Sequence, residues 1–313
     1  MENLNLNNYE FNQINKILNT VTEHFYKSNL CDKILYSQRL SFQLPTRLIE
    51  FIKKFQFSID KKTRLTLISN LVVDPNLKTP KFIKKAEDFS REDLLICSIA
   101  FILGEVFGWE EEQNGRIVHD VIPLKSHHDS QESTGSSKEI YWHTEEAFHD
   151  YSADYLVLLC IKNPDLIATS YCSINSLDLS DPVYDILFEP KFIFKKVSSH
   201  KSNSRETYIK PVLYGCRAKP FIKIDPFFME EAVDEEANNA FKSLIDYINL
   251  SLKYIILKPG DLLILDNLMC VHGRNSFLAK YDGNDRWLKR VNVTRDIYKL
   301  KKYGSHILSR ILK

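Results

Sequence analysis

From Ile140 onward, short runs of β-branched and aromatic residues follow one another, and this pattern limits the fold more than any other feature of the sequence. Residues of these types fit a pleated, half-buried surface, so each run predicts a strand. Two helical segments interrupt the runs, one beginning at Ser180-Asp181-Pro182 and one spanning about 229–249. The second part of the chain is therefore expected to be a β architecture braced by helices. The predicted strands are residues 155–161, 192–197, 221–224, 254–257, 262–265 and 291–294.

The first hundred or so residues have a mainly helical pattern. The clearest helix begins at Ser90, which forms a capping-box pattern with Asp93, and it is expected to end near Gly108. The longest apolar stretch, residues 94–107, contains Glu105 and is shorter than the ~20 residues of a membrane-spanning helix. This stretch predicts a helix in the protein core.

The length of 313 residues allows one large domain or two smaller ones. We expect an α+β fold in one domain over residues 1–313, with a mainly helical region at about 1–108 and a β core at about 115–298. Two polar loops, residues 126–138 and 198–206, flank predicted strands. Loops in such places commonly carry binding residues or close over a site.

The charge balance indicates a small-molecule partner. Lys and Arg number 42 against 41 Asp and Glu, which gives a net charge of +1 and no field that favours nucleic acid or a membrane surface. The six cysteines are scattered without a C-x-x-C pair, as in proteins that keep reduced, mostly buried thiols. The polar N-terminus lacks the features of a signal peptide, so we expect a cytoplasmic protein.

A candidate metal site begins at His143-Thr144-Glu145, where the period of a strand would direct His143 and Glu145 to the same side. A single His-x-Glu pattern is weak evidence, because two exposed residues on a strand would look the same. His272, at the end of another strand-like run, offers a third ligand. Two imidazoles and one carboxylate on one face of an iron ion leave three positions open, as chelation by 2-oxoglutarate and binding of O2 require. Arg286 follows on the next predicted strand and can bind the far carboxylate of 2-oxoglutarate in a forked manner.

The segments His143-Thr144-Glu145 and His272-Gly273-Arg274, followed by Tyr281-Asp282-Gly283 and by Asp285-Arg286-Trp287-Leu288-Lys289-Arg290, resemble the clavaminate synthase-like family. Its members include arginine, asparagine and lysine hydroxylases, and the resemblance covers roughly residues 85–298. It implies a catalytic domain with a jelly-roll, double-stranded β-helix core that holds iron between its two sheets. It also implies Fe(II), 2-oxoglutarate as cosubstrate, O2, and a free amino acid as substrate.

The resemblance also implies roles for individual residues. His143, Glu145 and His272 match the metal ligands. Arg286 matches the anchor for 2-oxoglutarate, and Thr169 matches a cosubstrate-binding hydroxyl, with Ser170 beside it as the alternative. For the substrate, Arg290 matches the residue that binds the α-carboxylate, Gln113 the residue that reads the α-amino group, and Ser133 a further residue of the same subsite.

Several of these residues allow other interpretations. His149 would extend the motif to a zinc-like His-x-Glu-x-x-x-His pattern, but a residue near the metal or on the surface is the expected outcome. The remaining histidines lack partner spacing, and the acidic residues at 230–236 are expected to form the start of a helix. Arg274 and Arg295 are candidates for buried ion pairs. The rival functions are a zinc hydrolase or deaminase, whose Pro-Cys-x-x-Cys segment is absent, and a non-catalytic binding module.

The substrate prediction depends on Asp225, which lies where the family places an aspartate against the substrate. The resemblance implies a second aspartate two residues away in arginine hydroxylases, but Lys223 and Phe227 occupy these positions here. One carboxylate suits a compact ammonium better than a planar guanidinium. The prediction is hydroxylation of free L-lysine at C3 or C4, with ornithine, arginine and asparagine as alternatives. The competing interpretation is that Asp225 only caps the turn before Pro226.

Overall fold

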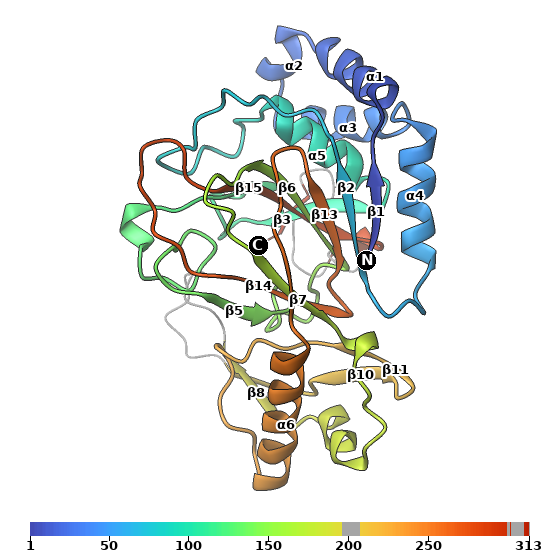
Figure 1. Ribbon diagram of the computed structural model, residues 1–313, viewed down its shortest axis with the longest axis vertical. Helices are drawn as coiled ribbons and strands as arrows, with labels where there is room; N and C mark the ends of the chain where they lie inside the picture. Colours follow the sequence, from blue (N-terminus) through green and yellow to red (C-terminus); the bar gives the residue numbers. More distant parts are fainter. Residues whose placement is uncertain (196–206, 299–300, 302–309, 313) are drawn as a thin grey trace.

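The computed structural model describes residues 1–195, 207–298, 301 and 310–312. Two β-sheets form the centre, and helices cover them on one side while a smaller group of elements lies at the opposite end (Figure 1). Residues 198–206, predicted as a polar loop, lie outside the described residues. The α-helices are α1 (Asn8–Asn19), α2 (Glu23–Lys27), α3 (Leu30–Ser41), α4 (Thr46–Phe57), α5 (Arg91–Ala100) and α6 (Glu235–Ser251).

The larger sheet has eight strands in the order β1-β2-β13-β6-β15-β3-β16, with β4 also paired to β15. Its longest strand pair, β6 and β15, is antiparallel, and residues of β6 alternate between two hydrophobic clusters. Val157 and Leu159 pack toward the helices, whereas Leu156 and Leu158 pack toward the smaller sheet. The strands are β1 (Glu2–Asn5), β2 (Leu65–Ser69), β3 (Glu105–Trp109), β4 (Val118–Val121), β6 (Tyr155–Lys162), β13 (Leu262–Asp266), β15 (Trp287–Thr294) and β16 (Ile311–Leu312).

The smaller sheet has four strands in the order β12-β7-β14-β5. Tyr171 and Cys270 of this sheet share a buried cluster with Leu156 and Leu288 of the larger sheet, so the two sheets face each other. The strands are β5 (Ile140–His143), β7 (Thr169–Ser173), β12 (Lys253–Ile255) and β14 (Cys270–Arg274).

Helix α5 lies at the centre of the helical layer on the outer face of the larger sheet. Ser90 and Asp93 form the predicted capping box, and α5 is buried along its length between α3 and strands of the sheet. The end predicted for this helix was wrong, because α5 stops at Ala100 and residues 105–109 form β3. A Cβ on Gly104 would lie 2.3 Å from the carbonyl oxygen of Thr294, so glycine permits the close approach at which the chain leaves the helix and joins β15.

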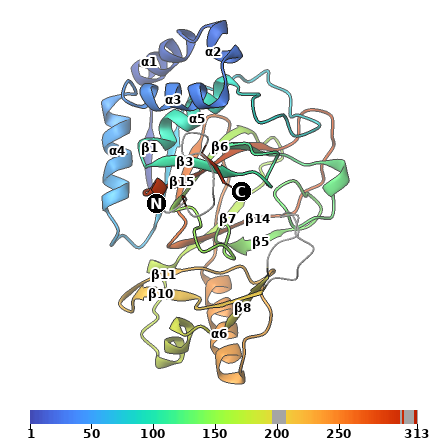
Figure 2. The same cartoon turned by 180° about the vertical axis from the view of Figure 1, so that it is seen from behind.

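The opposite end of the molecule consists of α6, the 3-10 helix η3 (Pro182–Phe188) and two hairpins (Figures 1 and 2). The hairpins are β8 (Phe192–Lys195) with β9 (Thr207–Lys210), and β10 (Leu213–Cys216) with β11 (Lys219–Ile222). Pro182 begins η3 as predicted, and Asp181 caps it. The acidic residues near the start of the predicted helix include its cap, because Asp234 caps α6. The helix begins at Glu235 instead of near 229. The other short 3-10 turns are η1 (Lys125–His127) and η2 (Ile174–Ser176).

Four charged side chains form a buried network between α5, β4 and β15. The Nζ of Lys289 lies 2.6 Å from Asp93 and 2.9 Å from Asp120, and Arg116 lies 3.5 Å and 3.6 Å from the same two carboxylates. The indole Nε1 of Trp287 also donates to Asp120. Because two acids balance two bases, the network can remain charged in the core.

All six cysteines are free, and four of them are buried, as the sequence predicted. In the described part of the chain, no helix combines the length and apolar character needed to span a bilayer.

Candidate active site

The two candidate histidine ligands are neighbours in the smaller sheet. His143 of β5 pairs directly with His272 of β14, and their ring centroids lie 4.7 Å apart. The Nδ1 of His143 lies 2.9 Å from the carbonyl oxygen of Tyr141, to which it can donate. This bond would leave Nε2 as the nitrogen available to a metal.

Glu145 completes the cluster from just beyond the end of β5. Its Oε2 lies 3.9 Å from Nε2 of His143 and 3.6 Å from Nε2 of His272. Asn267 fixes the backbone here, because its Oδ1 accepts from the N–H of Glu145 at 2.7 Å while its Nδ2 donates to the carbonyl oxygens of Glu145 and Ala153. The prediction that these three residues converge is confirmed.

This donor set fits a divalent iron ion. One potential ligand atom from each of His143, Glu145 and His272 lies within 4.8 Å of the others. The Oε2 of Glu145 is buried and accepts no hydrogen bond from the described residues, so a buried lone pair points toward the two imidazoles. Two histidines and one carboxylate are the set that non-haem iron oxygenases use.

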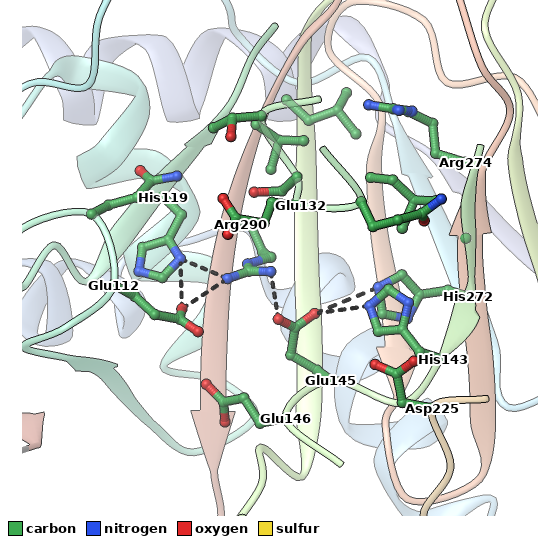
Figure 3. A pocket seen from close by; sticks show the side chains of 18 of the residues that line it. Glu112, His119, Glu132, His143, Glu145, Glu146, Asp225, His272, Arg274 and Arg290 are labelled. Atoms are coloured by element: carbon green, nitrogen blue, oxygen red, sulfur yellow. Dashed lines mark hydrogen bonds and ion pairs between the residues drawn. The ribbon is translucent and has the colours of Figure 1, made fainter. Parts of the chain in front are cut away.

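The other carboxylate oxygen of Glu145 connects the cluster to the larger sheet (Figure 3). Arg290 of β15 donates from Nη1 to this Oε1, and its Nη2 lies 3.1 Å from Oε2 of Glu112 and 2.7 Å from Nδ1 of His119. Arg290 therefore holds Glu145 with one terminal nitrogen and, with the other, binds His119 of the neighbouring strand β4 and Glu112 of the loop before β4.

His119 is neutral in this arrangement. Its Nε2 lies 2.9 Å from the carbonyl oxygen of Arg116, and its Nδ1 faces Arg290, which only donates. Burial and the charge of Arg290 lower the pKa of His119 to about 4. A proton on Nε2 and a lone pair on Nδ1 satisfy both contacts.

Arg286 is a buried cation with no counter-ion in the described part of the chain. It is 5% exposed, its Nη2 donates to Oγ1 of Thr169 at 3.2 Å, and no carboxylate of the described residues lies within ion-pair distance. Burial lowers the pKa of Arg286 to about 10. The nearby Arg274 donates to the carbonyl oxygens of Gly135, Lys138 and Asn275, and forms no ion pair with a described residue. A buried guanidinium of this kind fits an anionic ligand.

A single cavity of about 480 Å³ brings the predicted residues together. Its size suits a small metabolite. The predicted residues that line it are Gln113, Ser133, His143, Glu145, Thr169, Asp225, His272, Arg286 and Arg290.

The predicted substrate residues differ in the hydrogen bonds that they make within the protein. Gln113 lines the cavity, but its side-chain amide bonds the backbone of Asp120 in both directions, at 2.9 and 3.0 Å. Asp225 also lines the cavity, and burial raises the pKa of its carboxyl group, against the effect of His143 and of backbone bonds from Phe228 and Phe227. Asp225 thus caps its own turn and faces the cavity.

Sequence reasoning missed Glu112, His119 and Glu146, all of which line the cavity. Glu146 accepts from Nδ2 of Asn292 at 2.9 Å. His149 is not in the ligand cluster, because its ring stacks on Trp109 with centroids 4.0 Å apart. The Glu-Glu-Gln segment at 111–113 was the only sequence signal that could have drawn attention to Glu112.

Comparison with known proteins identifies the family. No family model matches the chain. The L-ornithine/L-arginine 3-hydroxylase of Catenulispora acidiphila is 35% identical over 287 residues, which cover 81% of this chain and 82% of that protein. The non-haem iron oxygenase OrfP, in a crystal structure with Fe and alpha-ketoglutaric acid, has a TM-score of 0.90 at 30% identity over the full length of both chains. The chain belongs to this family of iron- and 2-oxoglutarate-dependent amino acid hydroxylases.

The family membership confirms the resemblance seen in the sequence and identifies the chain as an Fe(II)/2-oxoglutarate-dependent oxygenase. The zinc hydrolase and the non-catalytic module are therefore set aside. The family includes proteins of different specificity, because an L-lysine 4-hydroxylase of Flavobacterium johnsoniae is 28% identical over 255 residues, or 76% of this chain and 68% of that protein. Membership alone does not choose among these amino acids.

Proposed function

We propose that this oxygenase hydroxylates C3 or C4 of a free L-amino acid whose side chain ends in an ammonium group, L-lysine or L-ornithine. One observation carries the proposal: a single cavity joins the His143, Glu145 and His272 cluster to two buried guanidinium groups and to Asp225. A free amino acid needs a site for each of its charged groups, and the cavity wall offers groups of both signs.

Residues of both sheets and of the adjoining loops would orient the cosubstrate and the substrate. Arg286 and Thr169 would bind the far carboxylate of 2-oxoglutarate, because Arg286 has no other counter-ion among the described residues. Arg290 would bind the α-carboxylate of the substrate, with Gln113 and Ser133 in the same subsite. His143, Glu145 and His272 would hold Fe(II).

With 2-oxoglutarate and O2 bound, iron supplies the oxidising power that removes hydrogen from an unactivated carbon. The protein contributes position and shelter from water. Both sheets close around the cluster, and Glu145 and His272 are 5% and 8% exposed, so the reacting atoms lie in a cavity that is largely screened from solvent.

The ammonium assignment depends on Asp225, the carboxylate predicted to face the substrate side chain. A single carboxylate can satisfy the compact charge of an ammonium group more fully than the two-edged guanidinium of arginine. The sequence favoured L-lysine. We include L-ornithine because it ends in the same group and because the chain is 35% identical to an L-ornithine/L-arginine 3-hydroxylase.

We further propose that the two facing sheets form a double-stranded β-helix and that residues 1–313 form one catalytic domain. Supporting this, strands β1, β2 and β3 of the mainly helical region complete the larger sheet. The six free cysteines fit the reducing cytoplasm that we propose as the compartment.

The test is to incubate the enzyme with Fe(II), ascorbate and 2-oxoglutarate and to measure hydroxylated products of L-lysine, L-ornithine, L-arginine and L-asparagine by mass spectrometry. His272→Ala should form no product. Asp225→Ala should lose most activity on the ammonium substrates, whereas Asp246→Asn, at an exposed position of α6, should behave as wild type. Much faster turnover of arginine or asparagine would refute the ammonium assignment. Full activity of Asp225→Ala would refute the role of Asp225, and no product from any of the four would refute the function.

A further inference from the structure

The α-carboxylate anchor proposed above, Arg290, has carboxylate partners within the protein. Arg290 binds Glu145 through Nη1, and its Nη2 bonds Glu112 and His119 (Figure 3). Its Nε is buried and has no hydrogen-bond partner among the described residues. A guanidinium has five N–H donors, so an incoming carboxylate that binds in a bidentate manner would use Nε and compete for donors at a terminal nitrogen.

The partners of Arg290 differ in how readily each can give up its bond to the guanidinium group. Glu145 belongs to the proposed metal site, and the ring of His119 is fixed by the carbonyl oxygen of Arg116 at 2.9 Å. Glu112 lies in the loop between β3 and β4, and its side chain is 17% exposed compared with 7% for Glu145. A side chain from a loop can change rotamer without disturbing a sheet.

A free amino acid carries its α-ammonium on the same carbon as its α-carboxylate. If the carboxylate binds Arg290, the ammonium lies within a few ångströms of that guanidinium and therefore near Glu112, which is 3.1 Å from Nη2. Glu146, another carboxylate that lines the cavity, is held by Asn292 of β15. Of the two, Glu112 is better placed to exchange one cation for another.

We propose that Glu112 is a specificity residue: it is a counter-ion of Arg290 and passes to the α-ammonium group of the substrate when the substrate binds. Glu112 thereby makes the enzyme select amino acids with a free α-amino group. This inference rests on the proposed function, and it adds a residue that acts beside Gln113.

A simpler role makes the opposite prediction. If Glu112 only neutralises Arg290 and is displaced on binding, removing its charge should strengthen binding of every carboxylate ligand. If Glu112 binds the ammonium, removing its charge should weaken binding of the amino acid. A hydrogen bond to a charged group contributes about 1.5–3 kcal/mol, which corresponds to a loss of roughly ten- to a hundredfold in affinity.

The experiment compares wild type, Glu112→Gln and Glu110→Gln by calorimetry, with Fe(II) and 2-oxoglutarate but without O2. The probes are L-lysine, L-ornithine and the α-hydroxy analogue of each, in which a hydroxyl replaces the α-ammonium. Glu110 is exposed and does not line the cavity, so Glu110→Gln is the matched control. We expect Glu112→Gln to weaken binding of the amino acids roughly ten- to a hundredfold. The dissociation constants of the analogues and of 2-oxoglutarate should change little.

Three results would overturn the inference: unchanged or tighter binding of the amino acids by Glu112→Gln, equal weakening of amino acids and analogues, or equal weakening of 2-oxoglutarate. In each case turnover by wild type would leave the proposed function standing. If wild type neither binds nor converts any of the amino acids, the proposed function and this inference both fail.

Discussion

Replacing Arg286 by methionine should make the ligand-free protein more stable while it abolishes the response to 2-oxoglutarate. Burial lowers the pKa of Arg286 to about 10, well below the ordinary value of a guanidinium. A buried cation with a lowered pKa destabilises the fold at every pH below its folded value, since the unfolded state binds the proton more tightly. At 1.36 kcal/mol per pH unit, the cost is roughly 3 kcal/mol near pH 7.

Methionine retains much of the aliphatic stem but removes the charge and the hydrogen bond to Thr169, which contributes about 1 kcal/mol. Arg286→Met should therefore raise the free energy of unfolding by about 1–2 kcal/mol. Wild type should gain about 2.7 kcal/mol when 2-oxoglutarate is present at a hundred times its dissociation constant, and the variant should gain nothing.

The assay is urea unfolding at pH 7 with Fe(II) and without O2, in the presence and absence of 2-oxoglutarate. Arg295→Met is the control, because Arg295 follows the same strand but pairs with Asp154 at 3.4 Å. This variant should lose stability and keep the response to 2-oxoglutarate. A destabilised Arg286→Met protein, or one that 2-oxoglutarate still stabilises, would show that Arg286 is a structural charge and not the anchor.

Two further predictions concern buried titratable groups that are not metal ligands. His119 has a pKa of about 4 in the folded state against an ordinary 6.5, so acidification favours the unfolded state. Between pH 7 and pH 4 the free energy of unfolding of wild type should fall by roughly 3 kcal/mol relative to that of His119→Gln, measured in urea titrations. A constant difference over that range would contradict a neutral, buried His119. Lys289→Met leaves Asp93 and Asp120 with one guanidinium and should cost about 3–5 kcal/mol, and adding Asp120→Asn should recover part of the loss. A cost below about 1 kcal/mol, or no recovery, would mean that charge balance does not stabilise this network.

The metal cluster could be predicted from sequence because its signals are local. His143 and Glu145 are two residues apart at a strand end, and His272 ends another strand-like run. The structure adds what spacing cannot give, namely the direct pairing of β5 with β14 and the bonds by which Asn267 holds Glu145. Glu112 and His119 could not be found in this way, because they act through Arg290, which is distant in sequence.

The boundary between α5 and β3 could not be predicted for a similar reason. Residues 94–107 are apolar with little interruption, and such a run fits a buried helix as well as a buried strand. The choice is made by tertiary contacts: β3 pairs with β15, placing Val106 opposite Val293, and Gly104 allows the chain to pass close to Thr294. Neither contact has a signal within the run itself.

The segment in which β15 begins, residues 286–290, contributes to both stability and binding. Arg286, Lys289 and Arg290 bring three positive charges into the core within five residues, and their partners differ. Lys289 forms ion pairs with two buried carboxylates and does not line the cavity. Arg290 shares Glu145 and Glu112 and borders the cavity, whereas Arg286 borders the same cavity with only the hydroxyl of Thr169 bound among the described residues.

This order is informative because a buried charge is costly unless it is paired. A fully paired cation such as Lys289 stabilises the ligand-free fold and has little to offer an anion. A cation with no counter-ion among the described residues, such as Arg286, can be compensated by an anionic ligand. A cation with an exchangeable counter-ion, such as Arg290, can discriminate among ligands by what the released carboxylate then binds. The degree of compensation over residues 286–290 therefore separates the structural lysine from the two proposed anchors.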